Sequence, residues 1–238
     1  RTTSSAASDV YKRQIINCTA NKCSGNKIYD EIFDIEFTPN RGDCLSIDGL
    51  LRDLSAFYDV EVNRDIYIDK IKAFDFSFTN DSENSCSNIS FLKLEIDNVP
   101  TSYIGSFKSY FSDLDIKKNN FFTDISNYIS YETGQPTHCY DYSKIFEPIT
   151  LGILKEECDF VTLLNKEINL QKGDLVFKDK NDEVINLAGV IGGKNTACDN
   201  KTKSVLLECA HFNPETIIGK TVKSVSYTHL RAHETDRH

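Results

Sequence analysis

Hydrophobic and polar positions alternate along much of this chain, and the alternation predicts short strands. In residues 30–38, Phe33, Ile35 and Phe37 fall on one side and acidic residues on the other, which is typical of a half-buried strand. Similar patterns predict further strands over residues 91–96, 102–107, 150–154, 159–164, 174–177, 183–188 and 204–210.

Three other segments are predicted to be helices, and in the first two the apolar residues lie three or four positions apart. The first reaches about residue 58, and either Asp43 or Ser46 can cap it. The second lies around residues 122–129, and Gly134 is suited to end it. The third begins at residues 213–214, where asparagine can cap and proline can take the first helical position.

The predicted strands outnumber the helices, and short turns join most of them. This favours an α+β fold with mixed or antiparallel sheets and a few helices over a doubly wound parallel sheet. Turn-forming residues cluster between residues 80 and 84, which suggests a linker. We expect five segments, divided as residues 1–14, 15–62, 63–86, 87–224 and 225–238.

The two terminal segments are polar and aperiodic, unlike the rest of the chain. Residues 1–14 and 225–238 resemble translated adapter sequence, so we exclude them from the fold prediction. The first contributes a charge of +2 to the total of −9 and the second contributes zero, so the remainder carries −11. A surface this acidic is poorly suited to bind a phosphate backbone by itself.

The cysteines and histidines give no metal-binding pattern. Eight cysteines are present, but no C-x-x-C pair occurs, so a zinc site is not expected. No secretory core and no apolar run of transmembrane length is found in the sequence. We therefore expect free thiols, a cytoplasmic location and no membrane partner.

Residues 206–210 place one carboxylate inside an otherwise apolar strand. Because strand side chains alternate, Leu206, Glu208 and Ala210 share one side of this strand. Burying a carboxylate without a polar partner costs several kcal/mol. Either a structural partner satisfies Glu208, or the carboxylate accepts a hydrogen bond from a ligand.

Several motifs together resemble one family. Residues 37–46 read FTPNRGDCLS, residues 124–128 read DISNY, and residues 134–138 read GQPTH. They are followed by LAGVIGG at residues 187–193 and LLECAHFNP at residues 206–214. In this order and at compatible spacings, they resemble the beta subunit of bacterial phenylalanyl-tRNA synthetase. The resemblance identifies residues 15–62 with the end of its N-terminal region and residues 87–224 with its editing domain.

The resemblance implies that this domain hydrolyses mischarged tyrosyl-tRNA. Glu208 would recognise the para-hydroxyl of tyrosine, while His138 and Asn127 would help to place the water and the terminal ribose. The residues Ala188, Gly189 and Gly192 would line the amino-acid side of the site. The alternatives are a salt bridge or solvent exposure for Glu208, an ordinary hydrogen-bonded role for His138, and a capping or turn role for Asn127.

Two other interpretations of these motifs are less favoured. Cys139 follows His138, but adjacent residues rarely form a nucleophile–base dyad. The glycines at 189, 192 and 193 do not match the G-x-G-x-x-G dinucleotide fingerprint. Close approach of the backbone to a ligand explains them better.

The resemblance also implies a larger enzyme. The complete synthetase would be an α2β2 ligase that uses ATP and Mg²⁺, with its aminoacylation site on the alpha subunit. The fragment itself would need no cofactor and no metal, and its substrate would be the 3′ end of tRNA(Phe) carrying tyrosine. Alternatives are a structural or tRNA-binding arm without editing, and a free-standing editing protein, which requires the chain to end near residue 224.

Overall fold

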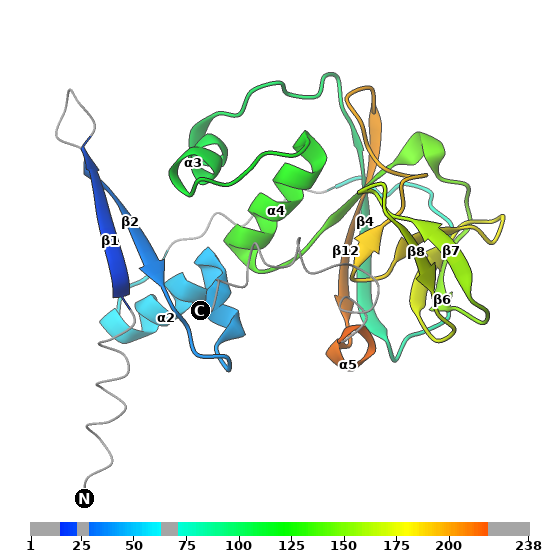
Figure 1. Cartoon of the computed structure of the whole chain (residues 1–238), viewed down its shortest axis with the longest axis horizontal. Helices are drawn as coiled ribbons and strands as arrows, with labels where there is room; N and C mark the ends of the chain where they lie inside the picture. The colour runs from blue at the N-terminus through cyan, green and yellow to red at the C-terminus, as the bar shows by residue number, and fades with distance from the viewer. Residues whose placement is uncertain (1–14, 23–28, 63–70, 219–238) are drawn as a thin grey trace, which may run out of the picture. The chain divides into compact units, whose positions relative to one another are not determined.

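The computed structural model describes residues 15–22, 29–62 and 71–218 (Figure 1). The two predicted terminal tails, residues 1–14 and 225–238, lie outside the described residues. The chain forms two compact units. The first groups Arg1–Ile66, Thr101–Asn119 and Asn127–Gln135, and the second groups Tyr67–Pro100, Asn120–Ser126 and Pro136–His238.

In the first unit, strands β1 (Ile15–Lys22) and β2 (Tyr29–Ile35) pair antiparallel. The 3₁₀ helix η1 (Gly42–Leu45) and helix α2 (Ile47–Tyr58) follow. The Ser46 hydroxyl accepts a hydrogen bond from the Gly49 N–H, so Ser46 is the cap of α2 and not Asp43. The prediction of this helix and its end at residue 58 is confirmed.

The segment before α2 is held by an ion-pair network. The Arg41 guanidinium donates to Asp43 at 3.0 Å and to Asp53 at 2.8 Å. A second arginine, Arg52, also pairs with Asp43. The Arg-Gly-Asp triplet therefore has a structural role within this unit.

Two helices with aromatic side chains complete the first unit. Helix α3 spans Gly105–Asp113, so the strand predicted over residues 102–107 is wrong. Tyr110 and Phe111 follow Phe107 by three and four positions, so the three rings meet on one side of the helix. Burial of Tyr110 and Phe111 there outweighs the short apolar–polar alternation that favours a strand. Helix α4 (Phe121–Thr133) contributes residues to both units, and Gly134 with φ +76° ends it as predicted.

The second unit contains a mixed five-stranded sheet in the order β11-β10-β9-β6-β3. The pair β3–β6 is parallel, and its other pairs are antiparallel. The strands are β3 (Phe78–Asn80), β6 (Ile149–Ile153), β9 (Leu175–Lys178), β10 (Val184–Leu187) and β11 (Ile191–Gly192).

An antiparallel three-stranded sheet and a hairpin complete this unit. The three-stranded sheet has the order β4-β12-β5, with β4 (Cys86–Glu95) and β12 (Ser204–Phe212) side by side along most of their length (Figure 1). Strand β5 is His138–Asp141. The hairpin pairs β7 (Cys158–Val161) with β8 (Glu167–Leu170).

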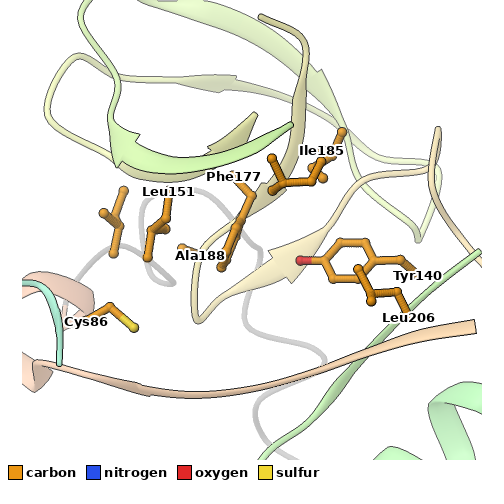
Figure 2. Packing of buried hydrophobic residues seen from close by; sticks show 9 residues of the cluster. Cys86, Tyr140, Leu151, Phe177, Ile185, Ala188 and Leu206 are labelled. Carbon is orange, nitrogen blue, oxygen red and sulfur yellow. The ribbon is translucent and has the colours of Figure 1, made fainter. Parts of the chain in front are cut away.

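Two hydrophobic clusters hold this unit together. One joins the two larger sheets through Tyr140 and Leu206 on one side and Leu151, Phe177 and Ile185 on the other (Figure 2). The other packs Val176 and Leu187 against side chains of the β7–β8 hairpin. Because Val176 and Phe177 point to opposite faces, β9 contributes to both clusters.

The predicted α+β class with mixed and antiparallel sheets is confirmed. Seven of the predicted strands occur with ends shifted by a few residues, and so does helix α5 (Pro214–Ile217), with Asn213 as its cap. Strands β1, β5, β8 and β11 were not predicted from the sequence. Strand β3 lies within the predicted linker and packs on the first cluster. Among the described helices, none is long and apolar enough to cross a membrane.

Candidate functional site

The Glu208 carboxylate is positioned by the middle strand of the three-stranded sheet. In β12, Glu208 lies directly opposite Phe91 of β4 and His138 of β5. Paired residues of an antiparallel sheet point to the same face, and their Cβ atoms lie about 4.5–5.5 Å apart. The carboxylate therefore has an aromatic ring on one side and an imidazole on the other, on the face that packs against the five-stranded sheet.

A chain of two hydrogen bonds reaches Glu208 from the neighbouring strands. The Tyr140 hydroxyl lies 2.5 Å from Oε2 of Glu208, and Nδ2 of Asn186 lies 2.6 Å from the same hydroxyl. Tyr140, Asn186 and Glu208 are 1%, 4% and 5% exposed. Figure 2 shows the Tyr140 ring beside Leu206 with its hydroxyl oxygen directed into the cluster. The buried carboxylate thus has a structural partner.

The two carboxylate oxygens of Glu208 differ in their hydrogen bonding, because only Oε2 is bonded to Tyr140. Within the described residues no hydrogen bond to Oε1 is found. In the same part of the chain, Oδ1 of Asn186 is a buried side-chain oxygen that also has no hydrogen-bond partner. An unpaired carboxylate oxygen at this depth is an acceptor for a donor that enters from outside.

Burial changes the proton affinity of this site. It raises the pKa of Glu208 to about 7, and the hydrogen bond from Tyr140 opposes that rise. The pKa of the Tyr140 hydroxyl is also raised, first by burial and then by the nearby carboxylate. The phenol therefore stays protonated and donates to Glu208.

The imidazole of His138 lies against the glycine turn after β10. A Cβ atom on Gly192 would sit 2.3 Å from Cε1 and 2.4 Å from Nε2 of His138, so only glycine fits there. The imidazole also meets the Tyr140 ring edge to face, with centroids 4.4 Å apart. Burial lowers the pKa of His138 to about 4, which keeps the ring neutral at pH 7. Its two nitrogens then provide one donor and one acceptor.

Cys139 lies on the opposite face of β5 from His138, because consecutive strand residues alternate. Its Sγ lies 3.6 Å from Oγ of Ser126 on α4, and burial raises the pKa of the thiol. This geometry gives no His138–Cys139 dyad. Asn127, the next residue of α4, is partly buried and groups with the first unit, so its predicted role stays a prediction.

The remaining predicted residues lie in the turn between β10 and β11. Ala188 is buried in the cluster between the sheets. Gly189 has φ +69°, and a Cβ there would meet Phe212 and Ile217 at about 3 Å. Packing therefore already requires glycine at residue 189, whereas Gly192 is the glycine in contact with His138.

The described residues contain no group of three or more histidine, cysteine or acidic side chains that could hold a metal ion. A cavity of about 1310 Å³ opens beside β6, β7 and β10, but Glu208, His138, Tyr140 and Asn186 do not line it. Its lining includes many charged side chains, such as the ion-paired Lys178 and Asp182. The candidate site rests on the buried polar groups around Glu208.

A family model described as the B3/4 domain matches residues 105–233, which contain His138, Gly192 and Glu208. The chain belongs to the B3/4 domain family. The resemblance to the phenylalanyl-tRNA synthetase beta subunit is also confirmed.

Curated relatives of this B3/4 domain are named phenylalanine–tRNA ligase beta subunit. That of Fusobacterium nucleatum is 34% identical over 79% of this chain and 24% of its own length. Those of Aquifex aeolicus and Photorhabdus laumondii are 32% and 29% identical over 78% and 82% of this chain, and each is covered over 24% of its length. The chain thus spans about a quarter of these relatives.

A solved structure is similar at lower identity. It is an N-terminal fragment of the phenylalanyl-tRNA synthetase beta subunit from Pyrococcus horikoshii, 14% identical, with 91% of this chain and 65% of that chain covered and a TM-score of 0.46.

Proposed function

We propose that this B3/4 domain hydrolyses the ester bond of tyrosyl-tRNA, as the proofreading part of an enzyme that attaches phenylalanine to tRNA. The observation that carries the proposal is the buried Glu208 carboxylate, which lies opposite His138 and has one oxygen without a hydrogen bond among the described residues. The names of the relatives support the part of the proposal that places this domain in a phenylalanine–tRNA ligase.

Glu208 selects the side chain in this proposal. Tyrosine differs from phenylalanine by one hydroxyl, which can donate to the free carboxylate oxygen. A phenylalanyl ring in the same place would leave that oxygen buried and unpaired. A hydrogen bond to a charged group contributes about 1.5–3 kcal/mol, so this single contact supports roughly tenfold to hundredfold discrimination.

Hydrolysis itself requires a placed water. The neutral His138 imidazole can accept a hydrogen bond from a water and hold it near the ester carbonyl. With its pKa lowered to about 4, His138 is a weak proton acceptor, so its main contribution is orientation. Gly192 leaves the space in which the ring lies, and Asn127 is proposed to help place the ribose. Water attacks directly, and no covalent intermediate is formed.

The charge of the chain limits how tRNA can be bound. Residues 15–224 carry −11, so the domain receives the aminoacylated 3′ end while other parts of a synthetase hold the tRNA body. By the same proposal, the complete enzyme pairs beta with alpha subunits, uses ATP and Mg²⁺ at a site outside this chain, and works in the cytoplasm.

One observation favours a second candidate function. The Tyr140 hydroxyl already donates to Glu208, and a carboxylate that has an internal partner can be purely structural. In that case the domain is a non-catalytic arm of the beta subunit.

Deacylation assays separate the two candidates. The purified full chain is incubated with tyrosyl-tRNA and phenylalanyl-tRNA, and the ester remaining is followed with time. Editing predicts faster hydrolysis of the tyrosyl ester and loss of that preference in Glu208→Ala. A rate equal to that of the uncatalysed reaction for both esters would reject editing and leave the structural arm.

A further inference from the structure

The hydrogen-bond chain at Glu208 has a definite direction. The amide nitrogen of Asn186 can only donate, so the Tyr140 oxygen accepts at that contact. A phenol has one proton, and the remaining contact of the hydroxyl is with Oε2 of Glu208. The proton of Tyr140 must therefore point at the carboxylate, and Glu208 must accept.

This arrangement divides the two oxygens of Glu208 between two tasks. Oε2 is occupied from within the fold, and the bond to it fixes the rotation of the carboxylate. Oε1 has no hydrogen bond in the described part of the chain. The internal phenol thus makes with one oxygen the same kind of bond that an incoming phenol would make with the other.

We infer that Tyr140 and Asn186 are positioning residues for phenol recognition: they hold Glu208 by Oε2, keep it in the accepting state, and leave Oε1 for the hydroxyl of the substrate. This inference rests on the proposed function. It makes specificity depend on three strands, because β5, β10 and β12 each contribute one member of the chain.

Loss of the Tyr140 hydroxyl should change the pH at which Glu208 becomes charged. A donor to the ionised form of a carboxyl group favours that form, and here Tyr140 opposes the effect of burial on Glu208. Removal of the Tyr140 hydroxyl leaves burial unopposed. Glu208 is then protonated at pH 7 and regains its charge only at higher pH, so preference for tyrosine should weaken at neutral pH and return in alkali.

The test measures the titration of Glu208 in the full chain. Glutamate labelled with ¹³C at the carboxyl carbon is titrated by NMR, and Glu208→Gln assigns the resonance. We expect Tyr140→Phe to raise the pKa of Glu208 by at least one unit, a tenfold change in its acid constant, and Asn186→Leu to raise it less. Tyr142→Phe is the matched control, because it removes a hydroxyl that donates to a different carboxylate, Glu147, at 2.7 Å.

An unchanged or lowered pKa of Glu208 in both Tyr140→Phe and Asn186→Leu would overturn the inference. Deacylation of tyrosyl-tRNA and phenylalanyl-tRNA across pH is the second measurement. Selectivity of Tyr140→Phe that recovers at higher pH supports the inference. Unaltered selectivity in Tyr140→Phe, combined with its loss in Glu208→Gln, overturns the positioning role and leaves the proposed function standing. Unaltered selectivity in Glu208→Gln itself rejects the proposed function.

Discussion

Gly192 and His138 are in direct contact: a Cβ atom at residue 192 would lie 2.3 Å from Cε1 of the imidazole. The ring cannot stay in place beside any larger residue. Gly192 belongs to the five-stranded sheet and His138 to the three-stranded sheet, so this contact fixes the imidazole where the two sheets meet.

We therefore expect Gly192→Ala to displace the imidazole and to slow hydrolysis of tyrosyl-tRNA at least tenfold, because misplacement of a reacting group by about 1 Å can cost up to a hundredfold in rate. The measurement is the deacylation rate, together with the NMR shifts of the His138 ring. Gly152→Ala is the control, since a Cβ there would meet only Asp81 at an ordinary 3.8 Å. Equal rates for the two variants would show that the contact has no role in hydrolysis.

The pH dependence of stability should reveal two opposing groups. Folding raises the pKa of Glu208 from 4.5 to about 7. Its contribution to the free energy of unfolding is therefore fully present below pH 4.5 and is lost as pH rises toward 7. The pKa of His138 is lowered from 6.5 to about 4, so its contribution is present above pH 6.5 and is lost as pH falls toward 4. Each shift corresponds to about 3 kcal/mol, and the two largely cancel in the wild type.

Single substitutions should separate these contributions. Between pH 4.5 and 6.5, Glu208→Gln should become more stable as pH rises, and His138→Asn should become less stable. Urea unfolding, followed through the NMR signals of β12 amides, measures both slopes. If the free energy of unfolding changed with pH in the same way in both variants, neither group would titrate as its burial requires.

Cys139 should be dispensable for hydrolysis, because it points away from His138 and contacts Ser126. We expect Cys139→Ala to change the deacylation rate by less than about twofold, because only interactions with the reacting groups change the chemical step. Burial raises the pKa of this thiol, so its alkylation by iodoacetamide at pH 8 should be slower than that of free cysteine. Loss of deacylation in a folded Cys139→Ala protein would restore the nucleophile hypothesis.

Local patterns in the sequence predicted part of this structure. The spacing in α4 and its end at Gly134, the cap of α5 at Asn213, and the face shared by Leu206 and Glu208 all follow from near neighbours. The strand predicted over residues 102–107 was wrong. The prediction rested on alternation over six residues, whereas the helical spacing becomes visible only when the pattern is followed to Phe111.

The partner of Glu208 could not be predicted from such patterns. Tyr140 lies 68 residues before Glu208, and Asn186 reaches Tyr140 from a different sheet. A buried tyrosine hydroxyl and a buried asparagine amide each need a hydrogen-bond partner. That need is the signal in the sequence that such residues take part in a hydrogen-bond chain. Which partner satisfies them depends on how the two sheets pack.

Recognition of the phenol by Glu208 is tested most directly by binding. Hydrolysis-resistant 3′-amide analogues of the aminoacylated tRNA end, one carrying tyrosine and one phenylalanine, are titrated into the full chain by calorimetry at pH 8. We expect the tyrosyl analogue to bind at least tenfold more tightly, and Glu208→Gln to remove most of that difference. Equal affinity of the wild-type chain for both analogues would contradict the role assigned to Glu208.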